Sequence, residues 1–256
     1  MNGKVIFFDI DGTLLNHNKE IPDSTRKAIQ DLKEAGHHVA IATGRAPFMF
    51  EDLRDELGID SFVSFNGQFV VFEGSVIYKN PLNKERLEEL LEFAYESAHP
   101  LVFMSDDTMM STESDHPYIH ESMGTLKFMH PEPDPEFYRN HEIYQSLLFC
   151  KVGEEESYKK YKDFHIIRWH DLATDILPFG GSKAEGIKKL IERLNIDKSD
   201  VYAFGDGLND LEMIKYVGTG VAMGNAVPGL KEIADEVTTD VDQDGILNGL
   251  KKIGLL

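Results

Sequence analysis

The sequence predicts an α/β protein in which a doubly wound parallel sheet carries an inserted α+β domain. Two observations favour this class: strand and helix patterns alternate over residues 4–80, and the alternation returns after Gly181. Repeated βα units of this kind build parallel sheets with helices on both faces. The intervening stretch has a different pattern. We therefore expect residues 1–80 and 181–256 to form one domain and residues 81–180 to form an insert.

The first part of the chain contains three apolar runs that we expect to form strands, each followed by a polar or helical segment. The predicted helix after the first run has its apolar stripe at Ala28, Ile29, Leu32 and Ala35, and Gly36 is suited to end it. The expected elements are strands at 4–9, 38–43 and 61–65, and helices at about 24–35 and ending near residue 58.

The βα pattern resumes near the C-terminal third of the chain. Ser182 and Glu185 have the spacing of a capping box, which predicts a helix from there to about residue 194. An apolar strand is expected at 201–205, followed by a polar turn and a short amphipathic helix. A further strand around 220–223 leads into the last helices.

The insert is predicted to begin with a helix and to continue with short strands. Its junctions are the Asn80-Pro81 pair and the segment Pro178–Gly181, which contains two glycines. Three closely spaced prolines, at 131, 133 and 135, mark an irregular connector. The expected elements are a helix at about 84–98 and β-like runs at 101–105, 143–151 and 164–169.

The composition excludes several classes of partner. The 256 residues include 26 Lys and Arg against 45 Asp and Glu, which gives a net charge of −19. Such a surface repels nucleic acids and anionic membranes, so we expect neither as a partner. Cys150 is the only cysteine, which excludes an internal disulfide and fits a reducing compartment. We find no apolar run near the ~20 residues of a membrane span and no signal peptide pattern, and we therefore expect a cytoplasmic protein.

Carboxylates stand at the ends of two predicted strands. Asp9 ends the first strand, Asp11 follows two residues later, and Asp206 comes directly after residues 201–205. Parallel strands end at one edge of a sheet, where ligands bind, so these distant side chains are expected to converge. Gathered carboxylates repel one another, which raises a pKa or recruits a cation, and oxygen ligands favour Mg²⁺. Either aspartate alone could instead cap its turn; the repeated placement favours a metal.

Three further positions are candidates for binding phosphate. Thr43, Gly44 and Arg45 end another apolar strand and open a helix, and amides at a helix start suit a phosphate, although threonine is also an ordinary N-cap. Lys183 lies in the first turn of its helix, where a cation opposes the helix dipole by roughly 0.3–1 kcal/mol. A bound anion would make the lysine favourable at this position. On an exposed surface, however, the helix can tolerate a cost of this size without any ligand.

The turn after Asp206 carries two more polar side chains. Asn209 and Asp210 follow within the same turn, and Asp210 is expected either to orient or bind a metal or to cap the next helix. The glycines at 12 and 207 permit close approach of a ligand to the backbone, although each could be only a turn residue.

Two other patterns imitate metal sites. Asp240, Asp242, Asp244 and Gly245 fit the first half of a calcium-binding loop, but Lys251 occupies the position of the final glutamate. Since few residues follow for an exit helix, we expect a turn here.

His116 and His120 have the spacing of zinc ligands on a helix, but Pro117 intervenes and no third ligand is near in the sequence. We do not expect zinc at this pair.

The order and spacing of these motifs resemble the haloacid dehalogenase-like (HAD) superfamily, and within it the Cof-type phosphatases. The resemblance covers about residues 1–80 and 180–256 and implies a HAD-like Rossmannoid core. One departure is the pair of glycines before Lys183 with Ala184 after it, where the family more often has one glycine on each side. The matching segments are Asp9–Thr13, Ala42–Arg45, Ser182-Lys183 and Gly205–Asp210, with lesser matches at Phe65–Gly67, Val221–Ala226 and Asp242–Gly245.

The resemblance implies a role for each matched residue. It implies that Asp9 is a nucleophile that forms an aspartyl-phosphate and that Asp11 is the general acid and base. It implies Mg²⁺ held by Asp9, Asp206 and the main-chain carbonyl of Asp11, with Asp210 behind them. The residues implied to hold the phosphoryl group are Thr43, Gly44, Lys183, Asn209 and the backbone of Ile10.

Motif spacing places the insert within the family scheme. Asp11 and Thr43 are 32 residues apart, which leaves room for one helix, whereas Thr43 and Lys183 are 140 residues apart. The excess matches an α/β cap between the second and third motifs, as in the branch that acts on sugar and cofactor phosphates. Phosphoglucomutase-like members usually carry a helical cap at the earlier position.

We therefore expect a Mg²⁺-dependent phosphatase that hydrolyses small phosphorylated metabolites through an aspartyl-phosphate. The alternatives are a phosphotransferase or mutase on the same fold and a non-catalytic phosphometabolite-binding protein. The insert carries 20 acidic and nine basic residues, so a second phosphate is not an expected feature of the substrate. The sequence leaves the substrate and the oligomeric state open. Possible contacts of the leaving group are Arg45, His116, Tyr118 and Arg168.

Overall fold

The computed structural model describes residues 3–256, which divide into two compact units. The first unit comprises residues 3–45, Phe50–Lys79 and Ser182–Leu256; the second comprises Ala46–Met49 and Asn80–Gly181. Each unit has its own sheet, and the two are described separately. Among residues 3–256, no helix is both long and apolar enough to cross a membrane.

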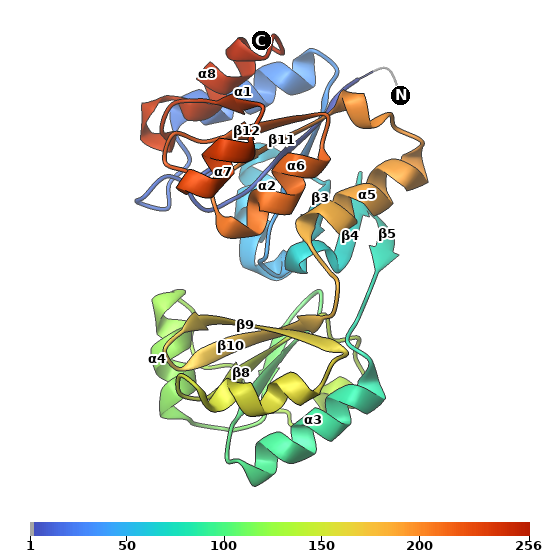
Figure 1. The fold of residues 1–256 in the computed structure, drawn as a ribbon, viewed down its shortest axis with the longest axis vertical. Helices are drawn as coiled ribbons and strands as arrows, with labels where there is room; N and C mark the ends of the chain where they lie inside the picture. The colour runs from blue at the N-terminus through green and yellow to red at the C-terminus, as the bar shows by residue number, and fades with distance from the viewer. Residues whose placement is uncertain (1–2) are drawn as a thin grey trace. The chain divides into compact units, whose positions relative to one another are not determined.

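The first unit is built on a mixed sheet of eight strands (Figure 1). Six neighbouring strands are parallel, in the order β13-β12-β11-β1-β2-β3, which confirms the predicted α/β class. The strands of this sheet are β1 (Val5–Phe8), β2 (His38–Ala42), β3 (Phe62–Ser64), β4 (Phe69–Phe72), β5 (Ser75–Lys79), β11 (Val201–Gly205), β12 (Thr219–Ala222) and β13 (Glu236–Val237).

The last two strands at one edge differ from the prediction. β4 and β5 form an antiparallel hairpin rather than a continuation of the βα pattern. The turn between them is Glu73-Gly74, in which both residues have positive φ, 47° and 72°. Two-residue loops of this kind match the twist of a hairpin. The sequence prediction of a parallel sheet was therefore wrong for this edge, because a two-residue turn leaves no room for a crossover helix.

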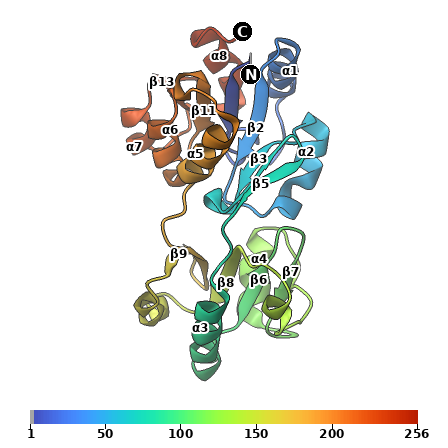
Figure 2. The same cartoon turned by 90° about the vertical axis from the view of Figure 1, so that its right-hand side faces the viewer.

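Helices cover both faces of this sheet. Figure 2 shows α1 and α2 on one side of the strands and α5, α6 and α7 on the other, and α8 packs on α1. The predicted boundaries of α1 and α5 agree with the structure to within a residue or so, and α2 ends at Gly58 as expected. The helices are α1 (Asp23–Glu34), α2 (Glu51–Leu57), α5 (Lys183–Leu194), α6 (Leu211–Tyr216), α7 (Pro228–Ile233) and α8 (Gly245–Lys252).

The central strand β1 is the most deeply buried part of the unit. All four of its residues are fully buried, and the ring of Phe8 stacks on Phe204 of β11 with centroids 5.0 Å apart. Burying side chains of this size contributes roughly 1.5–3 kcal/mol each. The strand end at Phe8 is therefore a rigid support for the residue that follows it, Asp9.

The second unit is an antiparallel sheet of five strands in the order β7-β6-β8-β10-β9. Helix α3 (Lys84–Glu96) buries Leu87, Leu90, Leu91 and Ala94 in an apolar cluster with one face of the sheet. The strands are β6 (Leu101–Met104), β7 (Met109–Ser111), β8 (Gln145–Phe149), β9 (Phe164–His170) and β10 (Ala173–Pro178).

Three elements of this unit were missing from the sequence prediction: β7, β10 and helix α4 (Pro117–Thr125). Pro117 does not prevent this helix from forming. Pro117 occupies the first helical position, where its missing N–H has no partner to lose, and His116 is the N-cap whose Nδ1 accepts a hydrogen bond from the amide of Tyr118.

Candidate active site

Three strand ends of the first unit bring polar residues to one edge of the sheet. Strands β11, β1 and β2 are neighbours, and Phe8 pairs with Phe204 on one side and Ile41 on the other. Asp206, Asp9 and Thr43 follow these strands within one or two residues. The predicted convergence of these side chains thus has its basis in the register of three parallel strands.

A buried lysine joins two of the carboxylates. Lys183 Nζ donates hydrogen bonds to Oδ1 of Asp9, at 2.5 Å, and to Oδ1 of Asp210, at 2.7 Å. The side chains of Lys183 and Asp210 are fully buried, and Asp9 is 7% exposed. Burial alone would lower the pKa of Lys183, but the two carboxylates raise it, so the lysine is held as a cation.

Asp210 is engaged at both oxygens. While Oδ1 accepts from Lys183, Oδ2 accepts from the backbone amides of Asp206 and Gly207, both at 2.9 Å. These bonds fix the turn that presents Asp206. The structure therefore shows Asp210 as an orienting group for both Lys183 and Asp206.

Asp206 is held from the opposite side by two polar side chains. Thr13 Oγ1 lies 3.2 Å from Oδ1, and Asn225 Nδ2 lies 3.3 Å from Oδ2. The same Asn225 nitrogen donates to the carbonyl of Gly12 at 2.8 Å. Gly12 has φ +81°, and a Cβ there would stand 2.3 Å from Oδ2 of Asp206, so this close approach requires glycine.

The three carboxylates form a group suited to a hard cation. Asp9, Asp206 and Asp210 each offer an oxygen, and these atoms all lie within 4.8 Å of one another. Burial raises the pKa of Asp9 to about 7 despite the attraction of Lys183. Burial and the charge of Asp210 raise the pKa of Asp206 to about 6. An all-oxygen donor set short of positive charge fits a divalent cation such as Mg²⁺.

Asp11 lies in a different electrostatic setting. Arg45 binds it through Nε at 3.0 Å and Nη2 at 2.7 Å, and Lys19 Nζ donates to it at 2.6 Å. Burial would raise the pKa of Asp11, but hydrogen bonds from the two cations hold that pKa below its usual value. The sequence analysis did not identify Lys19 as a partner of Asp11, because Lys19 lies in an exposed loop and belongs to no recognised motif.

The predicted phosphate-binding residues border the same edge. Thr43 is 2% exposed, and its Oγ1 accepts from the amide of Arg45 at 3.1 Å. The amides of Ile10 and Gly44 donate no hydrogen bond within the described residues, so both remain free donors. Asn209 Nδ2 lies 3.5 Å from Oδ1 of Asn66, the side chain that also lies against Gly44.

Sequence reasoning assigned no role to Thr13, Asn66 and Asn225, although all three lie within segments that resemble the family. Asn66 and Asn225 follow the ends of β3 and β12 by two or three residues. The signal that identified Asp9 and Asp206, a polar residue just after an apolar strand, would also have found these asparagines.

The three side chains of the second unit named as possible leaving-group contacts have local partners. Arg168 forms an ion pair with Glu155, at 2.5 Å and 2.8 Å, and donates to backbone carbonyls around Cys150 and His170. These bonds give Arg168 a structural role, and its hydrogen bonds lower the pKa of Glu155 to about 2. His116 and Tyr118 are joined to each other at the start of α4.

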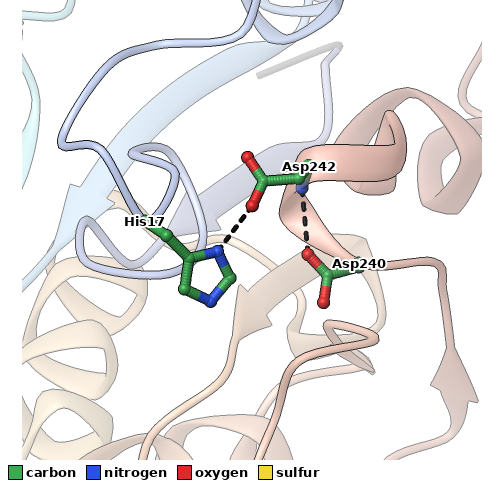
Figure 3. A group of neighbouring side chains, drawn as sticks. All are labelled: His17, Asp240 and Asp242. Carbon is green, nitrogen blue, oxygen red and sulfur yellow. Dashed lines mark hydrogen bonds and ion pairs between the residues drawn. The ribbon is translucent and has the colours of Figure 1, made fainter.

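A second group of potential metal ligands, His17, Asp240 and Asp242, lies at the surface of the first unit. His17 Nδ1 is 2.5 Å from Oδ2 of Asp242, and Asp240 Oδ1 accepts from the amide of Asp242 at 3.0 Å (Figure 3). Helix α8 begins at Gly245, within the twelve positions that a calcium-binding loop would occupy, and ends at Lys252, so no exit helix follows Lys251. The segment before α8 is a turn, and its aspartates interact with a histidine and with their own backbone.

Comparisons with known proteins identify the family and its relatives. The family model described as haloacid dehalogenase-like hydrolase matches residues 6–250. The "Putative phosphatase YkrA" of Bacillus subtilis (strain 168) is 60% identical over 256 residues, which is all of both chains.

Two solved structures are similar over nearly the full chain. A hypothetical protein from Geobacillus kaustophilus HTA426 is 59% identical, covers all of both chains and has a TM-score of 0.97. A sugar phosphatase of HAD subclass IIB is 30% identical, with a TM-score of 0.81, over 99% of this chain and 100% of the other.

Proposed function

The chain belongs to the haloacid dehalogenase-like hydrolases and is a phosphatase, and we propose that it hydrolyses small phosphorylated metabolites with Mg²⁺ through an aspartyl-phosphate. The observation that carries this proposal is the engagement of Asp9 by Lys183. The lysine binds Oδ1 and leaves Oδ2 without a hydrogen-bond partner among the described residues. A buried carboxylate with one oxygen fixed and the other free is positioned as a nucleophile.

In the proposed reaction, Oδ2 of Asp9 attacks phosphorus in line with the leaving group. A bond from phosphorus to Asp9 forms while the bond to the substrate oxygen breaks, and Asp11 donates a proton to that oxygen. Asp11, now ionised, takes a proton from water, which attacks the aspartyl-phosphate and releases inorganic phosphate. Arg45 and Lys19 favour the ionised form of Asp11, which is the form that takes a proton from water in the second step. Proton donation in the first step requires these hydrogen bonds to weaken when the substrate binds.

The residues that would hold Mg²⁺ are Asp9, Asp206 and the main-chain carbonyl of Asp11. When bound, the ion would neutralise charge on the phosphoryl oxygens and help to orient them. Asp210 would act behind these ligands, because its oxygens are already engaged by Lys183 and the turn amides. The phosphoryl group itself would meet Lys183, Thr43, Asn209 and the free amides of Ile10 and Gly44.

For the substrate, we propose a monoester of a sugar or a similar metabolite. The support is the resemblance to a sugar phosphatase of subclass IIB, 30% identical over almost the whole chain. We propose further that the insert at residues 81–180 determines which leaving groups are accepted, while residues 1–80 and 181–256 carry out phosphoryl transfer. The acidic composition of the insert argues against a second phosphate on the substrate.

The test is hydrolysis of phenyl phosphate by Asp9→Asn, with Asp23→Asn, a substitution at the start of the distant helix α1, as the control. Loss of the nucleophile is expected to lower kcat by at least ~10³-fold, while the control retains wild-type activity. The wild-type protein quenched during turnover should show a mass increase of one phosphoryl group on the peptide that contains Asp9. Wild-type activity in Asp9→Asn, or a label on another peptide, would overturn the proposal.

A further inference from the structure

The side chain of Asn225 joins three segments of the first unit. This half-buried residue follows the end of β12. Its Nδ2 donates to the main-chain carbonyl of Gly12 at 2.8 Å and lies 3.3 Å from Oδ2 of Asp206. Its Oδ1 accepts a hydrogen bond from the amide of Val241 at 3.0 Å. One amide group therefore connects the turn after β1, the turn after β11 and the loop between β13 and α8.

The orientation of this amide group is determined by its partners. A carbonyl oxygen can only accept and a backbone N–H can only donate, so Nδ2 must face Gly12 and Oδ1 must face Val241. Turning the amide of Asn225 by 180° would place two acceptors together at one partner and two donors together at the other. The remaining hydrogen of Nδ2 is then directed to Asp206.

The backbone on either side of Asn225 is bound to two of the same segments. The amide of Val227 donates to the carbonyl of Asp206 at 3.0 Å, and the amide of Gly224 donates to the carbonyl of Thr239 at 2.9 Å. Neither bond involves the asparagine side chain. We therefore expect the backbone to keep its path when that side chain is shortened.

Two of the segments that Asn225 joins carry proposed ligands of the metal. Asp206 is one ligand, and Asp11, whose main-chain carbonyl is another, directly precedes Gly12. Each oxygen of an ionised carboxylate has more than one lone pair, so Oδ2 of Asp206 can accept from Asn225 and still bind an ion. The amide thus restricts the separation between a carboxylate ligand and the segment that carries a main-chain ligand.

The ion that such a site prefers depends on how firmly its ligands are held. Mg²⁺ requires nearly ideal octahedral geometry with oxygens at about 2.0–2.1 Å, whereas Ca²⁺ accepts irregular sets of oxygens at about 2.3–2.6 Å. Restricting the separation of two ligands therefore favours the smaller ion. If the restriction is removed, the affinity for Mg²⁺ should fall more than the affinity for Ca²⁺.

We propose that Asn225 is a positioning residue for the metal and makes the site selective for Mg²⁺ over Ca²⁺. This inference rests on the proposed function, since it takes Asp206 and the carbonyl of Asp11 as ligands. Asn225 acts through these ligands, and phosphoryl transfer remains with Asp9 and Asp11.

The test is isothermal titration calorimetry of Mg²⁺ and of Ca²⁺ with the whole chain in the absence of substrate. In Asn225→Ala the Kd for Mg²⁺ is expected to rise by about 10- to 100-fold, the usual effect of removing a group that orients a ligand. The Kd for Ca²⁺ should rise less, so the ratio of the two constants should change by about 10-fold in favour of Ca²⁺. A merely structural residue would affect stability and leave this ratio unchanged.

Asn225→Ser is the second variant and is informative even if Asn225→Ala does not fold. Serine keeps a small polar group at this position but is too short to bond to Gly12 and Val241 at once. The ratio of the two constants should therefore change in the same direction as in Asn225→Ala.

Asn248→Ala is the matched control. Nδ2 of Asn248 donates to Oγ1 of Thr239 at 2.9 Å and to the carbonyl of Gln243 at 3.1 Å. This amide therefore binds the same loop between β13 and α8, but neither bond reaches a proposed metal ligand. Asn248→Ala should leave both dissociation constants unchanged. An unchanged ratio in the folded variants of Asn225, or an equal change in Asn248→Ala, would overturn the inference.

Asp206→Asn distinguishes failure of this inference from failure of the proposed metal site. If the wild-type protein binds Mg²⁺ and Asp206→Asn binds it more weakly, the ion occupies the proposed site and the variants of Asn225 alone decide the inference. If the wild-type protein binds no Mg²⁺, or Asp206→Asn binds it equally well, the proposed metal site fails and the role of Asn225 fails with it.

Discussion

Replacing Lys183 by methionine tests the electrostatic design of the site most directly. Methionine preserves most of the side-chain volume but removes the buried cation that binds Asp9 at 2.5 Å and Asp210 at 2.7 Å. Both carboxylates then remain buried without their common partner. We expect Lys183→Met to be strongly destabilising and inactive.

The magnitude follows from the burial of all three groups. Removing one member of a buried ion pair costs about 3–5 kcal/mol, because an uncompensated charge is left behind. Such a loss is large against the ~5–15 kcal/mol of a typical domain. The double variant Lys183→Met/Asp210→Asn should be more stable than Lys183→Met by roughly 1–3 kcal/mol, since an amide oxygen still accepts from the amides of Asp206 and Gly207. In the wild-type background, Asp210→Asn should be destabilising.

The assay is urea unfolding with a chelator present, so that no metal compensates the charges. Far-UV circular dichroism follows the whole chain, whereas the fluorescence of Trp169 follows only the second unit. The loss in Lys183→Met should appear in the first signal and not in the second. Lys188→Met is the control, because this lysine lies on the same helix, is 42% exposed and is 3.9 Å from Glu185. A cost below about 1 kcal/mol, or additive effects of the two substitutions, would refute the reasoning.

Three further predictions concern the charges around the metal site. Folding raises the pKa of Asp206 to about 6, above the ordinary value near 4. Without metal, the contribution of Asp206 to the free energy of unfolding should therefore fall as pH rises from about 4 to 6. Chemical denaturation measures this fall, which should be smaller in Asp206→Asn and smaller when Mg²⁺ is added to the wild-type protein. Arg45→Lys, which loses the two-point bond to Asp11, should lower kcat/KM for phenyl phosphate by about 10- to 100-fold. Gly12→Ala should raise the Mg²⁺ concentration for half-maximal activity more than 10-fold, about 1.4 kcal/mol, whereas Gly36→Ala, with φ +84° and open space, should not.

The sequence was most informative for polar residues that directly follow predicted strands. Asp9, Asp206 and Thr43 were identified because each follows an apolar run, and a parallel sheet brings such ends together whatever their separation in the chain. From its position alone, Lys183 was recognised as a cation in an unfavourable place, and the family resemblance implied that it binds the phosphoryl group. Its contact with Asp9 joins residues 174 positions apart and depends on how α5 packs, which no local pattern encodes.

The parts that could not be predicted are those in which local signals are ambiguous. The run at β4 is apolar like the parallel strands, and only the positive φ of Glu73 and Gly74 reveals a hairpin. In the second unit, Pro117 reads as a breaker, yet it is favourable at the first position of α4.

The charges of the site explain why Lys183 alone does not balance the three buried carboxylates. Asp9, Asp206 and Asp210 would together carry three negative charges, and Lys183 supplies one positive charge, so the buried group lacks two. Burial raises the pKa values of Asp9 and Asp206, and repulsion from Asp210 raises them further, so protonation is the other way to remove the excess charge. A divalent ion would balance the group and let Asp9 remain ionised at neutral pH, as a nucleophile must. We infer that Mg²⁺ binding and activation of Asp9 are one electrostatic event, and that both depend on Lys183 holding one oxygen in place.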